Sequence, residues 1–565
     1  MSEQSVGARI ARAILRFLAW CGLLVRGEVV RRVGGTARAR VIVIFGLVLA
    51  LNGADLATVG AIAQPLQKSL GISVTEIGLL SAASLLVGAI VTIPVGLFVD
   101  RAKRIPILAV SIVLWSIASL LSAFAGGYST LLLTRLLLGA VVATAGPAIA
   151  SLTGDYFPAQ ERARIYAYIL GGEVLGNAVG FIVCGSVAQA ISWRAAFVLL
   201  AIPGFFLARE LYRTVPEPLR GGQSHLQRGT VDLVQAAAEA RANAHADWSG
   251  DGRELPPTQE TETDDIARLA AQKLGARPDP ALILVDDPRT LTLVDSIRYV
   301  LSIPTNVLMI ISSAFGYFFF SGLSTFALLF VRGHYHVGFA TSELVLALLV
   351  GGALVGTLVS GWLSDAIVRR GYLNARVWFP ALCYLGAAVL LLPGFVSDHL
   401  TPAVWFDVAG AALLSAANPP LDAARLDIMP AGLWGRAESV RTTLRSLAQA
   451  LAPVLFGGLA GLIAGIAPPK QAPIGTHPPA VSPGEARGLE ITFIVMLVVL
   501  VAGGISLLRA RFTYAQDVAT AAASHQGSGA PTVSTRASHT LEDDADHQEE
   551  RRVRERRARR LRRGS

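Results

Sequence analysis

Ionisable residues stand inside long apolar stretches of this chain, where a charge needs a chemical reason. Asp55 lies in the run LNGADLATVG, Arg135 in LLLTRLLLG and Glu173 in ILGGEVLGN. Placing a charge at the centre of a hydrocarbon layer costs roughly 2.5–3.5 kcal/mol. Arg135 is the obvious counter-charge for Asp55, because an unpaired arginine at such depth would be costly. Together the three residues predict a buried site for binding or proton exchange.

Each carboxylate has two interpretations. Asp55, which follows Asn52, can belong to a substrate or proton site in a central cavity, or to a structural pair with an arginine of a neighbouring helix. Glu173 can load and release a proton near neutrality, because burial disfavours the charged form of a carboxyl. It can also stay protonated as a hydrogen-bond partner of Asn177 or its surroundings. The residues alone leave both questions open.

A second polar group follows the tenth apolar stretch. The dipeptide Pro419-Pro420 interrupts a helix there and leaves three polar residues near irregular backbone: Asn418, Asp422 and Arg425. Irregular backbone at membrane depth is tolerated where it lines a cavity. The same segment can instead be the cytoplasmic end of the span.

The next apolar stretch begins with Arg441, Arg445 and Gln449, whose four-residue spacing places them on one face of a helix. That face could receive an anionic head group, or it could pair with Asp422 and Asp427 as an inner gate. In the aromatic run FGYFFF, Tyr317 is expected to reach the cavity.

The composition indicates which elements hold these residues. Of the 565 residues, 53% are hydrophobic and 16% are charged, whereas soluble globular proteins carry roughly 25% charged residues. A span needs about twenty apolar residues, and in lipid it must be a helix because every backbone polar group needs an internal partner. Twelve spans are predicted: 41–62, 77–99, 106–125, 129–152, 164–190, 194–213, 304–331, 342–364, 377–396, 402–421, 439–466 and 489–510.

Basic residues are unevenly divided between the short loops, and this division predicts the orientation. One set of loops contains Arg101, Lys103 and Arg104, and later Arg369 and Arg370, whereas the opposite loops contain fewer basic residues. The richer set is expected to be cytoplasmic. With twelve spans, both termini of this multi-pass protein of the plasma or inner membrane would then be cytoplasmic as well.

Polar segments flank and join the spans. Residues 1–40 contain an amphipathic stretch that is expected to form a cytoplasmic helix lying on the membrane surface. Residues 214–303 form a long cytoplasmic connection, with surface helices expected near 229–246 and 289–302. Residues 512–565 are too polar to bury a core, so a disordered cytoplasmic tail is expected.

The tail ends in RRVRERRARRLRRGS, which holds much of the net charge of +9. Basic residues near a membrane gain about 1 kcal/mol each from anionic headgroups, so we expect headgroups and not nucleic acid as the partner of the tail. Three separated cysteines, Cys21, Cys184 and Cys383, provide neither a disulfide framework nor a metal site. No GxxxxGK[ST] run occurs, and no cofactor or metal is expected.

Two pairs of similar loops indicate an internal repeat. GLFVDR at 96–101 ends the second span, and GWLSDA at 361–366 ends the eighth. GDYFPAQERAR at 154–164 follows the fourth span, and LDIMPAGLWGRAE at 426–438 follows the tenth. The shared offset of about 265 to 275 residues predicts two similar halves.

The stretch Gly96-Leu-Phe-Val-Asp100-Arg101-Ala-Lys-Arg104 resembles the loop signature between helices two and three of the major facilitator superfamily. The resemblance covers residues 41–511. It implies an all-α membrane protein in which twelve transmembrane helices form two pseudo-symmetric six-helix bundles, 41–213 and 304–511.

The same resemblance implies roles for particular residues. Asp100 with Arg101 and Arg104 would latch the state that is closed on the cytoplasmic side, and Asp365 recurs at the matching place of the second half. Arg135 fits the spacing of the fourth-helix signature of many proton-coupled members. Gly172-x-x-x-Gly176-Asn177-x-x-Gly180 resembles the fifth-helix signature of exporters. The text around 52–60 and 135–180 is most similar to the spinster-type branch, which includes lysolipid and sphingolipid exporters.

The expected function is therefore secondary active transport by a monomer that rocks one half against the other, with the substrate site between the halves near the midplane. Proton coupling and export of an amphipathic or lipid-like small molecule or drug are expected. An uptake symporter for a solute or metabolite is the alternative, and a non-transporting scaffold or receptor is the alternative of another class. An enzyme is not expected, because the nine histidines are scattered and only His334 and His336 are close in sequence.

Overall fold

A computed structural model provides the three-dimensional structure. It describes residues 30–72, 74–220, 225–248, 271, 273–285, 288, 290–466 and 483–527. The amphipathic stretch expected in residues 1–40 lies mostly outside this part of the chain, as does the Arg-rich end of the tail. Within it, twelve helical spans are long and apolar enough to cross a membrane.

The first six spans form one bundle. Their helices are α3 (Thr36–Ala61), α5 (Val74–Arg101), α6 (Arg104–Ala123), α7 (Tyr128–Val142) continued by α8 (Ala145–Tyr156), α9 (Arg162–Val179) continued through a π-turn by α10 (Gly185–Ala190), and α11 (Trp193–Thr214). Within this bundle α3 packs along α9, and α6 packs along α11. A short helix, α4 (Ala63–Leu70), follows α3.

The last six spans form the second bundle. Their helices are α15 (Pro304–His334), α16 (Phe339–Arg369), α17 (Ala375–Val396), α18 (Leu400–Ala416) continued by α19 (Asn418–Asp427), α20 (Trp434–Ala464) and α21 (Pro483–Ala510). Here α15 and α17 both pack along α21, and α16 packs along α18. The two bundles meet where α5 contacts α20 and where α9 contacts α16. The predicted fold of two six-helix bundles is confirmed.

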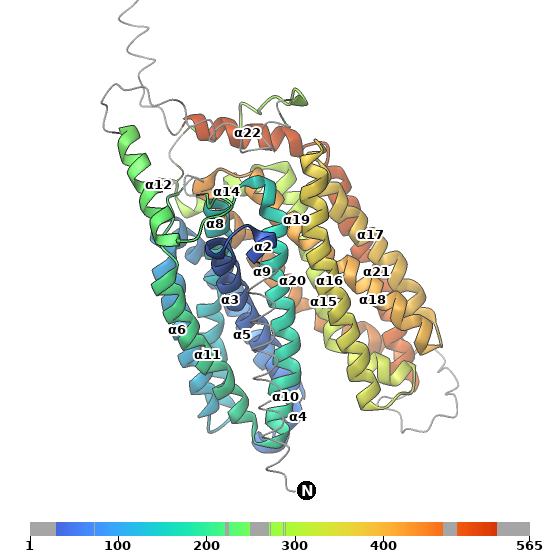
Figure 1. Ribbon diagram of the computed structural model, residues 1–565. Helices are drawn as coiled ribbons and strands as arrows, with labels where there is room; N and C mark the ends of the chain where they lie inside the picture. Colours follow the sequence, from blue (N-terminus) through green and yellow to red (C-terminus); the bar gives the residue numbers. More distant parts are fainter. Residues whose placement is uncertain are drawn as a thin grey trace, which may run out of the picture.

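Figure 1 shows the first bundle in blue to green and the second in yellow to red. We call the end that carries Asp100 and Asp365 the motif end. Three further helices accompany the bundles: α12 (Leu233–Trp248), α14 (Leu293–Ser302) and α22 (Tyr514–Gly527). In Figure 1, α14 and α22 lie at the motif end, and the bundles diverge toward the opposite end.

Two spans begin earlier than hydropathy predicts. Helix α3 starts at Thr36 and includes Arg38, and α20 starts at Trp434 and includes Arg436 and Glu438. These charged side chains are buried because each has an ionic partner; Arg38, for example, pairs with Glu161. A hydropathy count cannot foresee that pairing, so it ends the span at the last apolar residue.

Two sequence predictions need correction. The tenth span is interrupted before Pro419 and Pro420 as predicted, between α18 and α19, but the backbone that follows is helical and not irregular, because the prolines occupy the first turn of α19, where the missing N–H groups are not needed. The predicted disorder from residue 512 onward does not hold for residues 514–527, which form α22 and pack against α15.

The contact between α3 and α9 is made by backbone. A Cβ added to Gly172, Gly176 or Gly180 would overlap the carbonyl of Gly46, Ala50 or Ala54, respectively. Helices in lipid associate through close packing of small residues, since no hydrophobic force drives them together. The glycine spacing of the fifth span therefore has a packing function in this structure.

Candidate functional site

A cavity of about 110 Å³ lies between the two bundles. Helix α9 forms its wall on one side, and helices α15 to α19 form the other. Its polar lining residues are Glu173, Asn177, Tyr317, Thr357, Tyr384, Ser415 and Asn418. Its other lining residues are Leu170, Val174, Gly316, Phe320, Val350, Ala353 and Leu414. The volume has room for several water molecules or one small solute.

Glu173 is the one carboxylate in this lining. Across the described ranges, no ion pair or side-chain hydrogen bond to its carboxylate occurs. Asn177 does not bind the carboxyl group: its Nδ2 donates to the backbone oxygen of Glu173 at 3.1 Å, one helical turn away. The Glu173 carboxyl is therefore available to the contents of the cavity.

Arg445 does not line this cavity itself but stands against Tyr317, one of its lining residues. Its guanidinium lies 4.5 Å from the ring centroid of Tyr317, a cation–π arrangement that holds the charge in place without neutralising it. Of the predicted neighbours on its helix, Gln449 contributes its backbone oxygen, which accepts from Ser321 Oγ at 2.9 Å.

Glu173 and Arg445 occupy matching positions of the internal repeat. Each lies nine residues after a residue whose backbone N–H meets an aspartate of the other bundle: Arg164 in α9 and Arg436 in α20. The offset from Arg164 to Arg436 equals the offset from Glu173 to Arg445, 272 residues. The two halves therefore present opposite charges to the cavity from equivalent places.

Asp55 and Arg135 form the pair that the sequence suggests, with Arg135 Nη1 at 3.0 Å from Asp55 Oδ1. Arg135 also donates to Ser122 Oγ at 2.7 Å and lies 4.7 Å from the ring centroid of Phe197. The two residues are 3% and 1% exposed and do not line the cavity. This pair is located inside the first bundle, among α3, α6, α7 and α11.

Asn52 is also separate from the cavity. It lines a smaller space of about 30 Å³ within the first bundle, together with Trp115 and residues of α7 and α8. Of the residues proposed from sequence, the structure therefore brings Glu173, Asn177, Tyr317 and Asn418 together and leaves Asn52, Asp55 and Arg135 elsewhere.

A buried network of four charges lies between α19 and α20. Arg441 donates to Glu438 Oε1 at 2.6 Å and stands 3.4 Å from Asp422 Oδ1. Arg425 pairs with the same two carboxylates. The two acids balance the two arginines, so the network is neutral overall. Sequence reasoning missed Glu438, although its position three residues before Arg441 was a readable signal.

Only part of the expected inner gate is formed by this network. Arg441 does pair with Asp422, but Asp427 lies elsewhere, where it pairs with Arg376 and stands 3.4 Å from Arg162 of the first bundle. Arg445 has no anionic partner within the part of the chain that the structure covers. The three residues of the expected face therefore do not act together: Arg441 belongs to the charge network, whereas Arg445 stands against the cavity residue Tyr317.

The bundles are joined at the motif end by two equivalent contacts. Asp100 accepts hydrogen bonds from the backbone N–H groups of Gly435 and Arg436, both at 3.0 Å. Asp365 accepts one from the backbone N–H of Arg164 at 2.8 Å. Each aspartate thus caps the first turn of a helix in the opposite bundle, where free N–H groups and the helix dipole favour an anion.

Gly96 makes one of these contacts possible. A Cβ at this position would overlap Ser439 Oγ and approach the backbone oxygen of Gly435. The absence of a side chain lets α5 lie close enough to α20 for Asp100 to reach its first turn.

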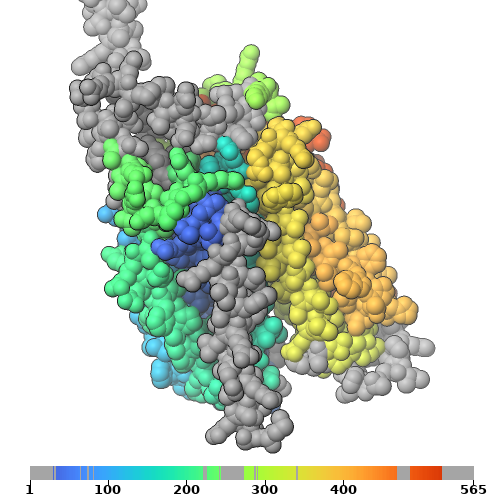
Figure 2. All heavy atoms as spheres, in the orientation of Figure 1, coloured from blue at the N-terminus to red at the C-terminus, as the bar shows by residue number. Residues whose placement is uncertain are grey.

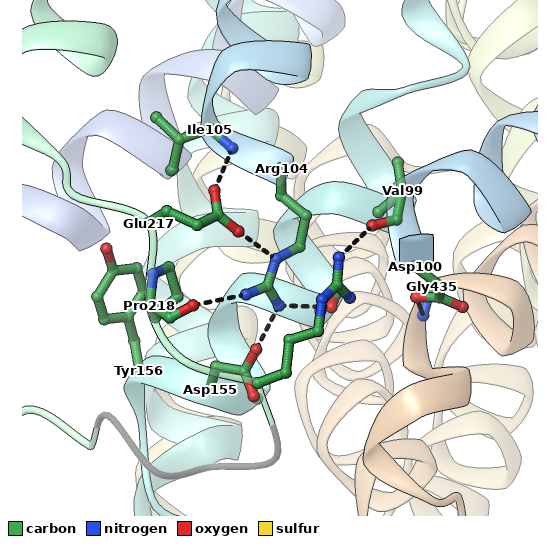
Figure 3. A network of polar contacts seen from close by, with 12 residues as sticks. Val99, Asp100, Arg104, Ile105, Asp155, Tyr156, Glu217, Pro218 and Gly435 are labelled. Atoms are coloured by element: carbon green, nitrogen blue, oxygen red, sulfur yellow. Dashed lines mark hydrogen bonds and ion pairs between the residues drawn. The ribbon is translucent and has the colours of Figure 1, made fainter. Parts of the chain in front are cut away.

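Arg104 does not take part in the latch with Asp100. Figure 3 shows Asp100 facing Gly435, whereas Arg104 points toward Asp155 of its own bundle and Glu217 of the segment that follows α11. Its Nε lies 2.8 Å from Glu217 Oε1, and Nη2 donates to the backbone oxygen of Pro218 at 3.2 Å. The expectation for Arg104 is wrong because this residue begins α6, so its side chain follows that helix into the first bundle.

Arg101 also binds elsewhere. Its Nη2 donates to the backbone oxygen of Leu291 at 2.9 Å. Arg436 donates to the backbone oxygen of Pro288 at 2.8 Å and to Ser296 Oγ at 2.7 Å. We call residues 279–285, 288 and 290–302 the inner strap. The inner strap therefore bonds to both bundles beside the Asp100 contact.

Helix α22 holds the inner strap against the second bundle. Thr520 Oγ1 and Ser524 Oγ accept from the backbone N–H groups of Asp279 and Leu284, both at 2.9 Å. Asp517 accepts from the backbone N–H of Thr305 at 3.0 Å at the start of α15, and burial raises the pKa of this carboxyl. Tyr514 donates to Asp427 at 2.7 Å.

In the described ranges, no group of three or more His, Cys, Asp or Glu side chains is arranged so that it could hold a metal ion. Cys184 and Cys383 are buried and unpaired.

Comparisons with known proteins agree with this architecture. A sequence model described as Major Facilitator Superfamily matches residues 45–453. The uncharacterized transporter YybO of Bacillus subtilis is 22% identical over 434 residues, which cover 76% of this chain and 87% of YybO. The hexuronate transporter of the same organism is 30% identical over 167 residues, which cover 30% of this chain and 40% of that transporter.

A solved structure of a bacterial homologue of the human lysosomal transporter spinster, inward-facing and occupied, has a TM-score of 0.53 to this chain. The two are 21% identical, and the alignment covers 85% of this chain and 98% of the homologue. At this identity the likeness concerns the fold.

Proposed function

Because the chain belongs to the major facilitator superfamily, we propose that it is a proton-coupled secondary transporter of a small organic anion. Membership in this superfamily makes it a multi-pass membrane transporter of a small molecule and not an enzyme. One observation supports the finer proposal: the cavity between the bundles contains an unpaired carboxylate, Glu173, and stands beside an arginine without an anionic partner, Arg445, within the described residues.

The charge of Arg445 supports an anionic substrate. An arginine without a carboxylate partner is a recognition element for carboxylates, which its planar fork binds in bidentate fashion. The hexuronate transporter that matches part of this chain carries a carboxylate sugar by its name. The volume of about 110 Å³ also favours a small solute over the lipid-like molecule that the resemblance to the spinster-type branch suggested.

The contacts between the bundles support alternating access. The Asp100 and Asp365 contacts close the motif end, whereas Figure 2 shows the surface notched between the bundles at the opposite end. We place the motif end in the cytoplasm, since basic residues are concentrated there, so this conformation would face outward. The Arg-rich tail would then meet the headgroups of the cell membrane.

Uptake fits these features better than export. Entry of an anion into a negative-inside cell costs about 2.3 kcal/mol per 100 mV of membrane potential. One proton that enters with the anion cancels this electrical cost. Glu173 is the residue proposed to carry the proton, and a monomer contains the whole site.

The test uses purified protein in proteoliposomes. An acidic exterior should drive accumulation of radiolabelled D-glucuronate, and a protonophore should abolish it. D-Glucose serves as the neutral control. Accumulation that ignores the proton gradient would contradict the coupling, and accumulation of glucose alone would contradict the anionic substrate.

A further inference from the structure

We propose that Glu173 and the substrate carboxylate compete for the positive charge of Arg445, so that each anion bound requires one proton on Glu173. This inference rests on the proposed function and names how its site selects and couples the substrate. It makes Arg445 the carboxylate-binding residue and Glu173 the internal competitor.

The two residues belong to opposite bundles and meet the same cavity, Glu173 directly and Arg445 through Tyr317. Glu173 belongs to the lining of α9, and Arg445 is held on Tyr317, a lining residue of α15. No ion pair joins Glu173 to Arg445 in the described part of the chain, so their charged atoms lie beyond ion-pair distance of each other. A carboxylate bound between the two groups would accept from Arg445 and, once Glu173 is protonated, also from Glu173.

The other charges near Glu173 are already balanced. Asp422 of α19 and Arg441 of α20 stand 3.4 Å apart, within the neutral network that includes Arg425 and Glu438. Helices α15 and α17 contribute the hydroxyls of Tyr317 and Tyr384.

The remaining neighbours carry no charge: α16 contributes Thr357 and Ala353 to the cavity, and Gly53 of α3 faces the Glu173 backbone. Arg445 is consequently the uncompensated charge that influences both the protonation of Glu173 and the binding of an anionic ligand.

Charge balance gives the rule of exchange. The empty cavity is neutral with ionised Glu173 and Arg445, and it is neutral again with protonated Glu173, Arg445 and one carboxylate. A carboxylate beside ionised Glu173 would leave one excess negative charge, since like charges at one site disfavour joint ionisation. Protonated Glu173 without ligand would leave one excess positive charge. The site therefore favours monoanions over both dianions and neutral solutes.

The matching positions of the two residues support this rule. Glu173 and Arg445 lie on equivalent helices, each nine residues after the residue that contacts Asp365 or Asp100. Repeat symmetry alone would place identical groups there. Opposite charges instead make the empty cavity electrically neutral, which a like-charged pair could not do.

The experiment measures binding of D-glucuronate to nanodisc-embedded protein by calorimetry between pH 5 and pH 8, where the ligand stays ionised. Wild-type affinity should fall by about tenfold per pH unit once Glu173 ionises, as linkage to one proton requires. Glu173→Gln should bind as the wild type does at pH 5 across the whole range. Arg445→Gln should lose at least tenfold at every pH, and Arg445→Lys should recover part of it.

The outcomes separate the inference from the proposed function. A Glu173→Gln protein that keeps the wild-type pH slope, or an Arg445→Gln protein with wild-type affinity, would overturn the competition while proton-driven glucuronate flux stands. Failure of D-glucuronate, benzoate and galactarate alike to bind wild-type protein at any pH would overturn both. Galactarate, a dianion, should bind more weakly than D-glucuronate, and tighter binding would also overturn the selection rule.

Discussion

Asp100, in the last turn of α5, accepts a hydrogen bond of 3.0 Å from the backbone N–H of Arg436 in the first turn of α20. The two residues are separated by 336 positions and belong to different bundles. Asp365 repeats the arrangement with Arg164 at 2.8 Å. The motif end is therefore closed by two contacts of the same kind, each between a side chain and a helix terminus.

Replacing Asp100 by Ala should open the motif end. A hydrogen bond to a charged group contributes about 1.5–3 kcal/mol, so the population open at this end should rise by about tenfold to a hundredfold. Spin-label distances across the motif end would measure the shift. Asp365→Ala should act similarly, whereas Glu239→Ala on exposed α12 is the matched control. An unchanged distance distribution in both aspartate variants would contradict the latch.

Replacing Asp55 by Asn should destabilise the protein more than it changes transport. Removing one partner of a buried ion pair costs about 3–5 kcal/mol because the other charge stays uncompensated, and Arg135 is 1% exposed. The double variant Asp55→Asn with Arg135→Gln should recover part of the loss in thermal stability. Loss of proton-driven flux in a well-folded double variant would instead assign the pair to coupling.

Replacing Gly176 by Ala should disturb the contact between α3 and α9. The added Cβ would overlap the backbone of Ala50, and overpacking of this kind costs about 1–3 kcal/mol. Gly351→Ala is the control, because a Cβ there meets nothing within 4 Å and alanine favours a helix by up to about 1 kcal/mol. Melting in detergent should separate the two variants, and equal midpoints would argue against close packing at Gly176.

Truncation after Arg511 should release the inner strap. The deletion removes Thr520 and Ser524, which accept from its backbone, and amide hydrogen exchange over residues 290–302 should therefore accelerate. Truncation after Gly527 retains α22 and is the matched control. Unchanged exchange after the longer deletion would show that Arg101 and Arg436 hold the strap by themselves.

Docking of α22 should weaken as pH rises through the acid range. Burial raises the pKa of Asp517 above its ordinary value of 3.8, so the docked helix binds protons that the undocked helix releases. The docked state is then most stable below the ordinary pKa, and it loses stability until the pH exceeds the raised pKa.

Asp517→Asn removes this pH dependence. The amide oxygen can still accept from Thr305, so exchange protection of α22 at pH 7, corrected for the intrinsic rate, should rise above that of the wild type. Lower protection in this variant would mean that the negative charge at the start of α15 stabilises docking more than its burial opposes it.

The spans could be predicted from the sequence because run length and hydropathy are local properties. The repeat was equally accessible, since the loop signatures at 96–101 and 361–366 are local text at a fixed offset. Helix α22 could not be predicted in this way, because its alanines and polar residues do not form an apolar run of the length that marks a span. It docks through residues spaced three or four apart, Tyr514, Asp517, Thr520 and Ser524, whose partners lie more than 80 positions away.

The partners of the charged residues were the hardest feature to predict from the sequence. Arg104 stands four positions from Asp100 in the chain, yet its partners Asp155 and Glu217 are 51 and 113 positions distant. Residues that are close in sequence but belong to two different helices can direct their side chains into different bundles. Sequence spacing does not report that direction. The pairing of Asp55 with Arg135 was predictable from the energetic need for a partner, whereas their distance from the cavity was not.

Helices α9 and α20 each begin at a contact with the other bundle and carry a cavity charge nine residues later. That separation corresponds to about 14 Å along the axis, or about two and a half turns of helix. Over so short a length an α-helix behaves as a stiff rod. A force produced when the cavity changes its charge can therefore reach the closed end through continuous backbone, without a relay of side chains that must rearrange in sequence. Each half of this transporter thus has one stiff helical segment that connects the cavity to the closed end.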